Sequence, residues 1–108
     1  LTFEDIANGL KKGSHLLVDV RDHSEVAMSG KAAGATHVPL FQLATHADPS
    51  HPDYKSDFSK DKTIVLYCAS GARSRAAIQS LSRLGYSDLH NLGGLQNWLR
   101  AGGAVEHA

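Results

Sequence analysis

The only cysteine of the chain, Cys68, stands among residues that suit nucleophilic chemistry. The stretch CASGAR, residues 68–73, follows an apolar run at 64–67 and precedes a helical pattern that opens at Ser74. Half of this stretch is Ala or Gly, and small side chains let the backbone curl and expose its N–H groups. A curl of N–H groups ahead of a helix binds anions. Such a cradle favours the thiolate, the nucleophilic form of cysteine.

Arg73 adds a fixed positive charge to this loop, suited to gripping an anionic substrate or to steadying a thiolate or persulfide. The seven histidines are scattered, and none stands at a recognisable dyad spacing from Cys68. Hydrolysis of amides by Cys–His chemistry needs both a base and an acid. Attack on a sulfur atom that carries a good leaving group needs little more than a thiolate and an anion cradle. The residues therefore favour chemistry at sulfur. The alternative is that Cys68 is a small buried packing residue at the end of a strand.

Strands and helices alternate along the chain and give the loop its position. Short apolar runs predict strands, and the run before Cys68 is the clearest because it is β-branched and aromatic. This order predicts an α/β domain with a mostly parallel central sheet, whose sites form at the carboxyl ends of the strands. The expected strands are 15–20, 35–40, 63–67 and 88–92, ended by Gly93-Gly94. The expected helices are 2–12, 22–28, 74–84 and 95–99, with a surface excursion at 45–62 that holds one helical turn at 54–58.

Length and charge narrow the class of protein. The 108 residues predict one domain, 1–108, and a single cysteine cannot form an internal disulfide. Eleven basic and eleven acidic residues give a net charge of zero, so we expect neither nucleic acid nor a membrane as partner. No apolar stretch approaches membrane-spanning length. A lone thiol suits a reducing compartment. We expect a cytoplasmic protein, or a periplasmic one if a signal peptide preceded Leu1.

Several short motifs occur in the order typical of one family. They are LVDVR at 17–21 with Glu25 behind it, GA at 34–35 leading to HVPL at 37–40, and the Cys68 loop followed by Ser74. LGY at 84–86 and LGG at 92–94 with Trp98 and Gly102 complete the set. Together they span about residues 16–103. On these residues the chain resembles a single-domain rhodanese, a thiosulfate sulfurtransferase.

The resemblance implies a five-stranded parallel sheet flanked by helices on both faces. It implies that Cys68 takes the outer sulfur of thiosulfate or a similar donor, releases sulfite, and passes the sulfur from a persulfide to cyanide or another thiophile. The expected partners are thus a small anionic sulfur donor and a thiol or protein acceptor, with no cofactor and no metal. Asp19 and Arg21 are expected to support the structure rather than the chemistry. The backbone N–H groups of five residues are expected to cradle the persulfide, namely Ala69, Ser70, Gly71, Ala72 and Arg73. The Arg73 side chain is expected either to anchor the loop or to bind the anionic donor.

The chain departs from the family at one segment. Rhodaneses usually carry Gly-His-Ile-Pro-Gly-Ala, whereas residues 30–35 read GKAAGA. His, Ile and Pro are all replaced, so we expect some lost packing and a different rim around an intact loop. The excursion at 45–62 is also longer than in the smallest members, and one hypothesis is that it shapes access to Cys68.

Three other interpretations compete with sulfur transfer. Phosphatases and arsenate reductases related to this fold use a Cys-x5-Arg loop, but this chain has Cys-x4-Arg, which suits the sulfur of a persulfide better than a phosphate. A rhodanese-like domain can also serve as a non-catalytic binding module or a sulfur relay, although such modules often lack the cysteine. A cluster at 46–53 of His46, Asp48, His51 and Asp53 has metal-binding side chains, but its spacing does not aim them at one point.

Overall fold

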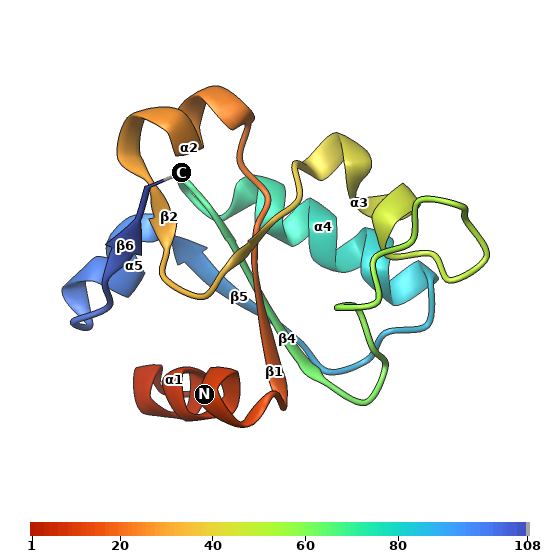
Figure 1. The fold of residues 1–108 in the computed structure, drawn as a ribbon, viewed down its shortest axis with the longest axis horizontal. Helices are drawn as coiled ribbons and strands as arrows, with labels where there is room; N and C mark the ends of the chain where they lie inside the picture. The colour runs from red at the N-terminus through yellow and green to blue at the C-terminus, as the bar shows by residue number, and fades with distance from the viewer. Residues whose placement is uncertain (108) are drawn as a thin grey trace.

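The computed structural model describes residues 1–107 as an α/β fold around a parallel sheet (Figure 1). The sheet order is β3-β1-β4-β5, and all neighbouring strands run parallel. This confirms the predicted α/β class. The strands are β1 (His15–Asp19), β3 (Thr36–His37), β4 (Thr63–Cys68) and β5 (Leu89–Gly94). The helices are α1 (Phe3–Lys12), α2 (His23–Ser29), α3 (Leu40–His46), α4 (Ala72–Arg83) and α5 (Leu95–Arg100).

Helices cover both faces of the sheet, with α3 and α4 on one side and α1 and α5 on the other (Figure 1). Along β1, Leu16 and Val18 enter the first core while Leu17 enters the second. Residues 16–19 of this strand are all buried, as expected for a central strand that is covered on both faces. Every helix except α2 contributes buried apolar residues to one of these cores, so packing on both faces holds β1 and β4 in place.

The ends of α1 follow the sequence signals, whereas α4 begins at Ala72, two residues before the expected start at Ser74. Thr2 accepts a hydrogen bond from the N–H of Asp5, and the Asp5 carboxylate accepts one from the N–H of Thr2, which forms a capping box. Gly13 ends α1 at a φ of 78°, a conformation that glycine adopts without strain. None of the helices in residues 1–107 is long and apolar enough to cross a bilayer.

The parallel sheet has four strands within residues 1–107, not the five that the resemblance implied. Two short strands, β2 (Lys31–Ala32) and β6 (Val105–Glu106), instead form a separate antiparallel pair. The N–H of Ala32 donates to the Tyr67 hydroxyl at 2.9 Å, so it is not available to a strand of the main sheet. β5 also runs through Gly93 and Gly94, which were expected to break it. They pair with Tyr67 and Cys68 after a register shift.

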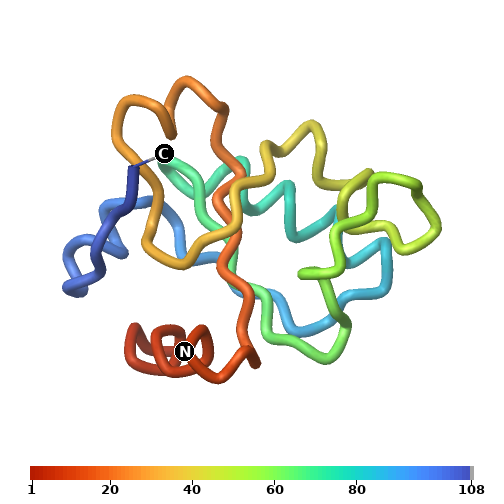
Figure 2. The backbone as a smooth tube through the Cα atoms, in the orientation of Figure 1, coloured from red at the N-terminus to blue at the C-terminus, as the bar shows by residue number. Residues whose placement is uncertain are grey.

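The segment after β3 differs from the prediction. The expected strand at 35–40 is only two residues long, and helix α3 begins at Leu40, directly after Pro39. Figure 2 shows the chain then looping outward through residues 47–62. This segment contains turns and no helical turn at 54–58.

The same outward loop is nevertheless anchored to the core. Phe58 is fully buried and packs edge-on against Tyr86, with ring centroids 6.3 Å apart. The Tyr86 hydroxyl donates to the carbonyl of Ala47 at 2.6 Å. Tyr86 follows the C-terminal end of α4, whereas Cys68 precedes the N-terminal end of that helix. The loop therefore packs at the opposite end of α4 from the thiol.

Candidate functional site

Cys68 is the last residue of β4, at the carboxyl end of a central strand, and it is fully buried. The loop that follows curls back over the sulfur because Gly71 adopts a φ of 99°, a conformation that strains any residue with a Cβ. The Gly71 N–H donates to Cys68 Sγ at 3.0 Å. Helix α4 begins one residue later, at Ala72. The loop thus presents a backbone donor to the thiol.

Opposing effects set the pKa of Cys68. Burial raises it, but hydrogen bonds from the Ser74 side chain and from the N–H groups of Ser74, Gly71 and Ser70 lower it more. The resulting pKa is about 7, below the ordinary 9.0. A substantial fraction of the sulfur is therefore thiolate at neutral pH, as a nucleophile requires.

Ser74 and Asn91 complete the surroundings of the sulfur, although the sequence analysis gave neither a place in the site. Ser74 is fully buried, and its Oγ lies 3.5 Å from Cys68 Sγ and 2.7 Å from Asn91 Oδ1. Asn91 Nδ2 donates to the Gly71 carbonyl at 3.0 Å, while its Oδ1 accepts from the N–H of Gly93 at 2.9 Å. These bonds tie the loop to β5. A polar residue between Leu89 and Leu92 was the only sequence signal for Asn91.

The Arg73 side chain turns to α2. Its two terminal nitrogens bind the two oxygens of Glu25 at 2.5 and 2.9 Å. This bond, with the N–H of Asp22, lowers the pKa of Glu25 to about 2, and the carboxylate raises the pKa of Arg73. Of the two roles the sequence left open for Arg73, this geometry corresponds to anchoring the loop. The sequence placed Glu25 in a motif but gave no sign of its partner.

Of the five residues expected to bind substrate, Gly71 donates its N–H to the sulfur, and the N–H of Ser70 also lowers the pKa of the thiol. Ala69, Ala72 and Arg73 lie in the same loop. Ala69 and Ala72 are exposed, and Arg73 is half-buried. Their roles toward a substrate stay predictions.

Asp19, the last residue of β1, forms a buried ion pair with Arg21. Arg21 Nη2 lies 2.8 Å from Asp19 Oδ2, and the Tyr67 hydroxyl donates to the same oxygen at 2.6 Å. Burial and the Asp19 carboxylate raise the pKa of Tyr67, so its hydroxyl stays protonated. The pair joins β1 to β4 below the loop, in keeping with the expected structural role.

The polar cluster at 46–53 serves local turns. Asp48 accepts bonds from the N–H and hydroxyl of Ser50, and His51 Nδ1 accepts from the N–H of Asp53. Among residues 1–107, no three side chains of His, Cys, Asp or Glu converge on a point where a metal ion could bind.

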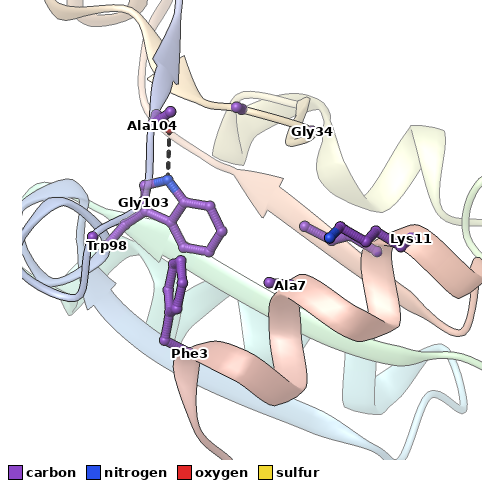
Figure 3. Close-up of a pocket in the computed structure, with 10 residues that line it drawn as sticks. Phe3, Ala7, Lys11, Gly34, Trp98, Gly103 and Ala104 are labelled. Atoms are coloured by element: carbon purple, nitrogen blue, oxygen red, sulfur yellow. Dashed lines mark hydrogen bonds between the residues drawn. The ribbon is translucent and has the colours of Figure 1, made fainter.

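An apolar hollow lies away from the loop, between α1 and the segment that follows α5 (Figure 3). Its volume is about 340 Å³, and the rings of Phe3 and Trp98 form one wall, with centroids 4.9 Å apart. No residue of the Cys68 loop lines it. It therefore has no part in the chemistry of the thiol.

Comparison with known proteins agrees with this geometry. Residues 2–101 match the sequence model of the Rhodanese-like domain. A protein of Allochromatium vinosum named "Sulfurtransferase" is 38% identical over 88 residues, which cover 81% of this chain and 74% of that protein.

Solved structures give the same fold. A Rhodopseudomonas palustris protein described as a protein of unknown function and possible tyrosine phosphatase superposes with a TM-score of 0.82 and 35% identity, over 98% of this chain and 83% of that one. The human single-domain sulfurtransferase TSTD1 superposes with a TM-score of 0.74 and 28% identity, over 93% and 94%. By its sequence and its fold, the chain belongs to the rhodanese-like domain family.

Proposed function

We propose that this protein is a thiosulfate sulfurtransferase in which Cys68 carries the sulfur. The observation that carries the proposal is a buried thiol at the carboxyl end of β4 that receives a hydrogen bond from the Gly71 N–H at 3.0 Å and has a pKa of about 7. Relatives named as sulfurtransferases support sulfur transfer as the general chemistry.

The first half-reaction loads the sulfur. The Cys68 thiolate attacks the outer sulfur of thiosulfate, the S–S bond of thiosulfate breaks, and sulfite leaves with the bonding electron pair. The product is the anionic persulfide Cys68–S–S⁻. The N–H groups of the loop stabilise this anion as they stabilise the thiolate. Sulfite needs no proton to leave, so the lack of an adjacent general acid is no obstacle.

The second half-reaction removes the sulfur from Cys68. Cyanide attacks the outer sulfur, thiocyanate forms, and Cys68 leaves as the thiolate. The N–H of Gly71 donates to Sγ at 3.0 Å and stabilises that thiolate as its charge returns. A thiol of a small molecule or of a protein partner takes the place of cyanide in the same step.

Formation of thiocyanate from thiosulfate and cyanide tests the proposal. We expect turnover by the wild-type protein and none by the Cys68→Ser variant, whose circular dichroism and melting temperature stay close to those of the wild type. Turnover by the variant would overturn the role of Cys68. Absence of turnover in both proteins, with binding of a partner retained, would favour a binding module.

A second candidate is phosphatase chemistry, which the description of the Rhodopseudomonas relative favours. Against it, the Arg73 guanidinium is occupied by Glu25 on both terminal nitrogens. No side chain of the loop offers an acid to protonate an alkoxide leaving group. We expect no measurable hydrolysis of p-nitrophenyl phosphate, and steady Cys68-dependent hydrolysis would reverse the order of the two candidates.

A further inference from the structure

A small cavity borders the Cys68 loop, and its lining has the chemistry of an anion site with an apolar wall. Its volume is about 210 Å³, and it is lined by Arg21, Ser29, Ala69, Leu95 and Gln96. These residues come from the end of β1, the last turn of α2, the loop and the first turn of α5. Ala69 directly follows Cys68 in the chain, so the cavity borders the loop that holds the thiol.

Arg21 supplies a fixed donor to this cavity. Its side chain is only 5% exposed, and its Nε and Nη2 are both held by Asp19. Nη1, by contrast, donates only to Ser29 Oγ, at 2.8 Å, among the described residues. Because Nη1 carries two hydrogens, one N–H is left without an acceptor in a side chain that lines the cavity. A buried guanidinium N–H without a partner is costly, so an anionic oxygen that reaches it is favoured.

Gln96 provides a second donor at the rim. Its Oε1 accepts a hydrogen bond from Arg100 Nη2 at 3.2 Å, which leaves its NH₂ group as the free end of the amide. Arg21 lines the cavity and Arg100 contacts Gln96 at its rim, while Asp19, the carboxylate bonded to Arg21, also accepts from Tyr67. The opposite wall is apolar, formed by the side chains of Leu95 and Ala69.

We propose that this cavity binds the carboxylate end of a small organic thiol, a mercaptocarboxylate, that accepts sulfur from Cys68. The inference rests on the proposed function. The room, roughly seven water volumes, exceeds what diatomic cyanide fills. The Leu95 and Ala69 wall suits the methylene stem of such a thiol, and the N–H groups of Arg21 and Gln96 suit its carboxylate. Thiosulfate has no stem to contact this wall.

Sulfur transfer to such an acceptor balances without a further reactant. The sulfur of the thiol R–SH attacks the outer sulfur of Cys68–S–S⁻, and a new S–S bond forms as the bond to Cys68 Sγ breaks. The electron pair of the broken bond returns to Cys68 as the thiolate. The proton of the thiol stays with the product R–S–SH, so no oxidant or reductant is needed.

The test compares two acceptors on protein preloaded with thiosulfate, namely 3-mercaptopropionate and its uncharged counterpart 2-mercaptoethanol. The measured quantity is the ratio of their kcat/KM values, in which general damage to the loop cancels. We expect Gln96→Glu to lower this ratio about fivefold and Gln96→Lys to raise it by a similar factor, as a nearby unit charge does at a partly exposed position. The variants Gln79→Glu and Gln79→Lys, on the exposed face of α4, make the same charge changes elsewhere and should leave the ratio unchanged.

Each outcome has a definite meaning. A ratio that stays within twofold of the wild type in both Gln96 variants overturns the subsite, as does an equal change in the Gln79 variants. Ser29→Ala, which frees the second N–H of Arg21 Nη1 without changing charge, should raise the ratio. If the protein never takes sulfur from thiosulfate, the proposed function itself fails. If it loads sulfur and yields it to both thiols without discrimination, only the carboxylate subsite fails.

Discussion

Arg73 and Glu25 face each other in a two-pronged ion pair, with N–O distances of 2.5 and 2.9 Å, although 48 residues separate them in the chain. Arg73 stands at the start of α4, one residue before Ser74, and Glu25 lies in the first turn of α2. The pair therefore fixes the Cys68 loop to α2, the helix that follows the neighbouring strand β1. Arg73 positions the loop, and the backbone N–H groups meet the sulfur.

This ion pair predicts the effect of Glu25→Gln. This change keeps the size of the side chain but removes its charge, so the loop loses a charge-assisted anchor. We expect thiosulfate:cyanide turnover to fall roughly tenfold with the fold retained, and Arg73→Ala to weaken turnover in the same way. Turnover and thermal melting of each variant check this.

The matched control is Glu4→Gln, on the exposed first turn of α1 and outside every ion pair of the described residues. It should keep the wild-type rate. The double variant Glu25→Gln/Arg73→Ala should be little worse than either single variant because the two side chains act as a unit. Fully additive losses would show that they act separately.

The pKa of about 7 at Cys68 predicts a pH profile. The rate of alkylation of the native protein by iodoacetamide should rise through pH 7 and level off above pH 8. For the denatured protein, this rate should rise near pH 9 instead. The same lowered pKa favours folding above pH 9, and this contribution is lost as the pH falls through 7. An alkylation midpoint at pH 9 for the native protein would contradict stabilisation of the thiolate by the loop.

Ser74 predicts a change in that profile. Removing its hydroxyl in Ser74→Ala deletes the side-chain bond to Sγ, the largest of the effects that lower this pKa. We expect the alkylation midpoint to rise by about 1, with slower turnover at pH 7 that recovers at pH 9. Ser82→Ala, an exposed serine further along α4, is the control and should keep the midpoint. An unmoved midpoint in Ser74→Ala would leave the backbone alone as the cause.

The close approach of Gly94 to the loop predicts that β5 supports the loop tightly. A Cβ at this position would lie 2.2 Å from the Ala69 carbonyl oxygen, so Gly94→Ala must displace the backbone beside Cys68. We expect a loss of about 1–3 kcal/mol in the free energy of unfolding and a larger loss of turnover than stability alone explains. Gly13→Ala, where a Cβ has open space but φ is 78°, should cost about 1 kcal/mol and leave turnover intact. Equal turnover in the two variants would contradict close support by β5.

The contrast between sequence and structure follows the range of the interactions. The strand before Cys68, helix α1 and the C-terminal end of α4 were predictable because their signals are local: apolar runs, a capping threonine, a terminal glycine. Helix α3 was missed because Pro39 stands at its start and Leu43 alone is fully buried along its seven residues. Asn91 and Glu25 were missed as parts of the site because their partners lie 20 and 48 residues away. A single sequence does not pair residues at that distance.

The central claim is that Cys68 carries a persulfide, and the intact mass of the protein tests it most directly. The mass is measured before thiosulfate, after thiosulfate, and again after cyanide. We predict a gain of one sulfur atom, located on Cys68 and absent from Cys68→Ser, and its removal by cyanide. A mass that never changes, in a folded protein whose thiol alkylates at pH 7, would contradict the account.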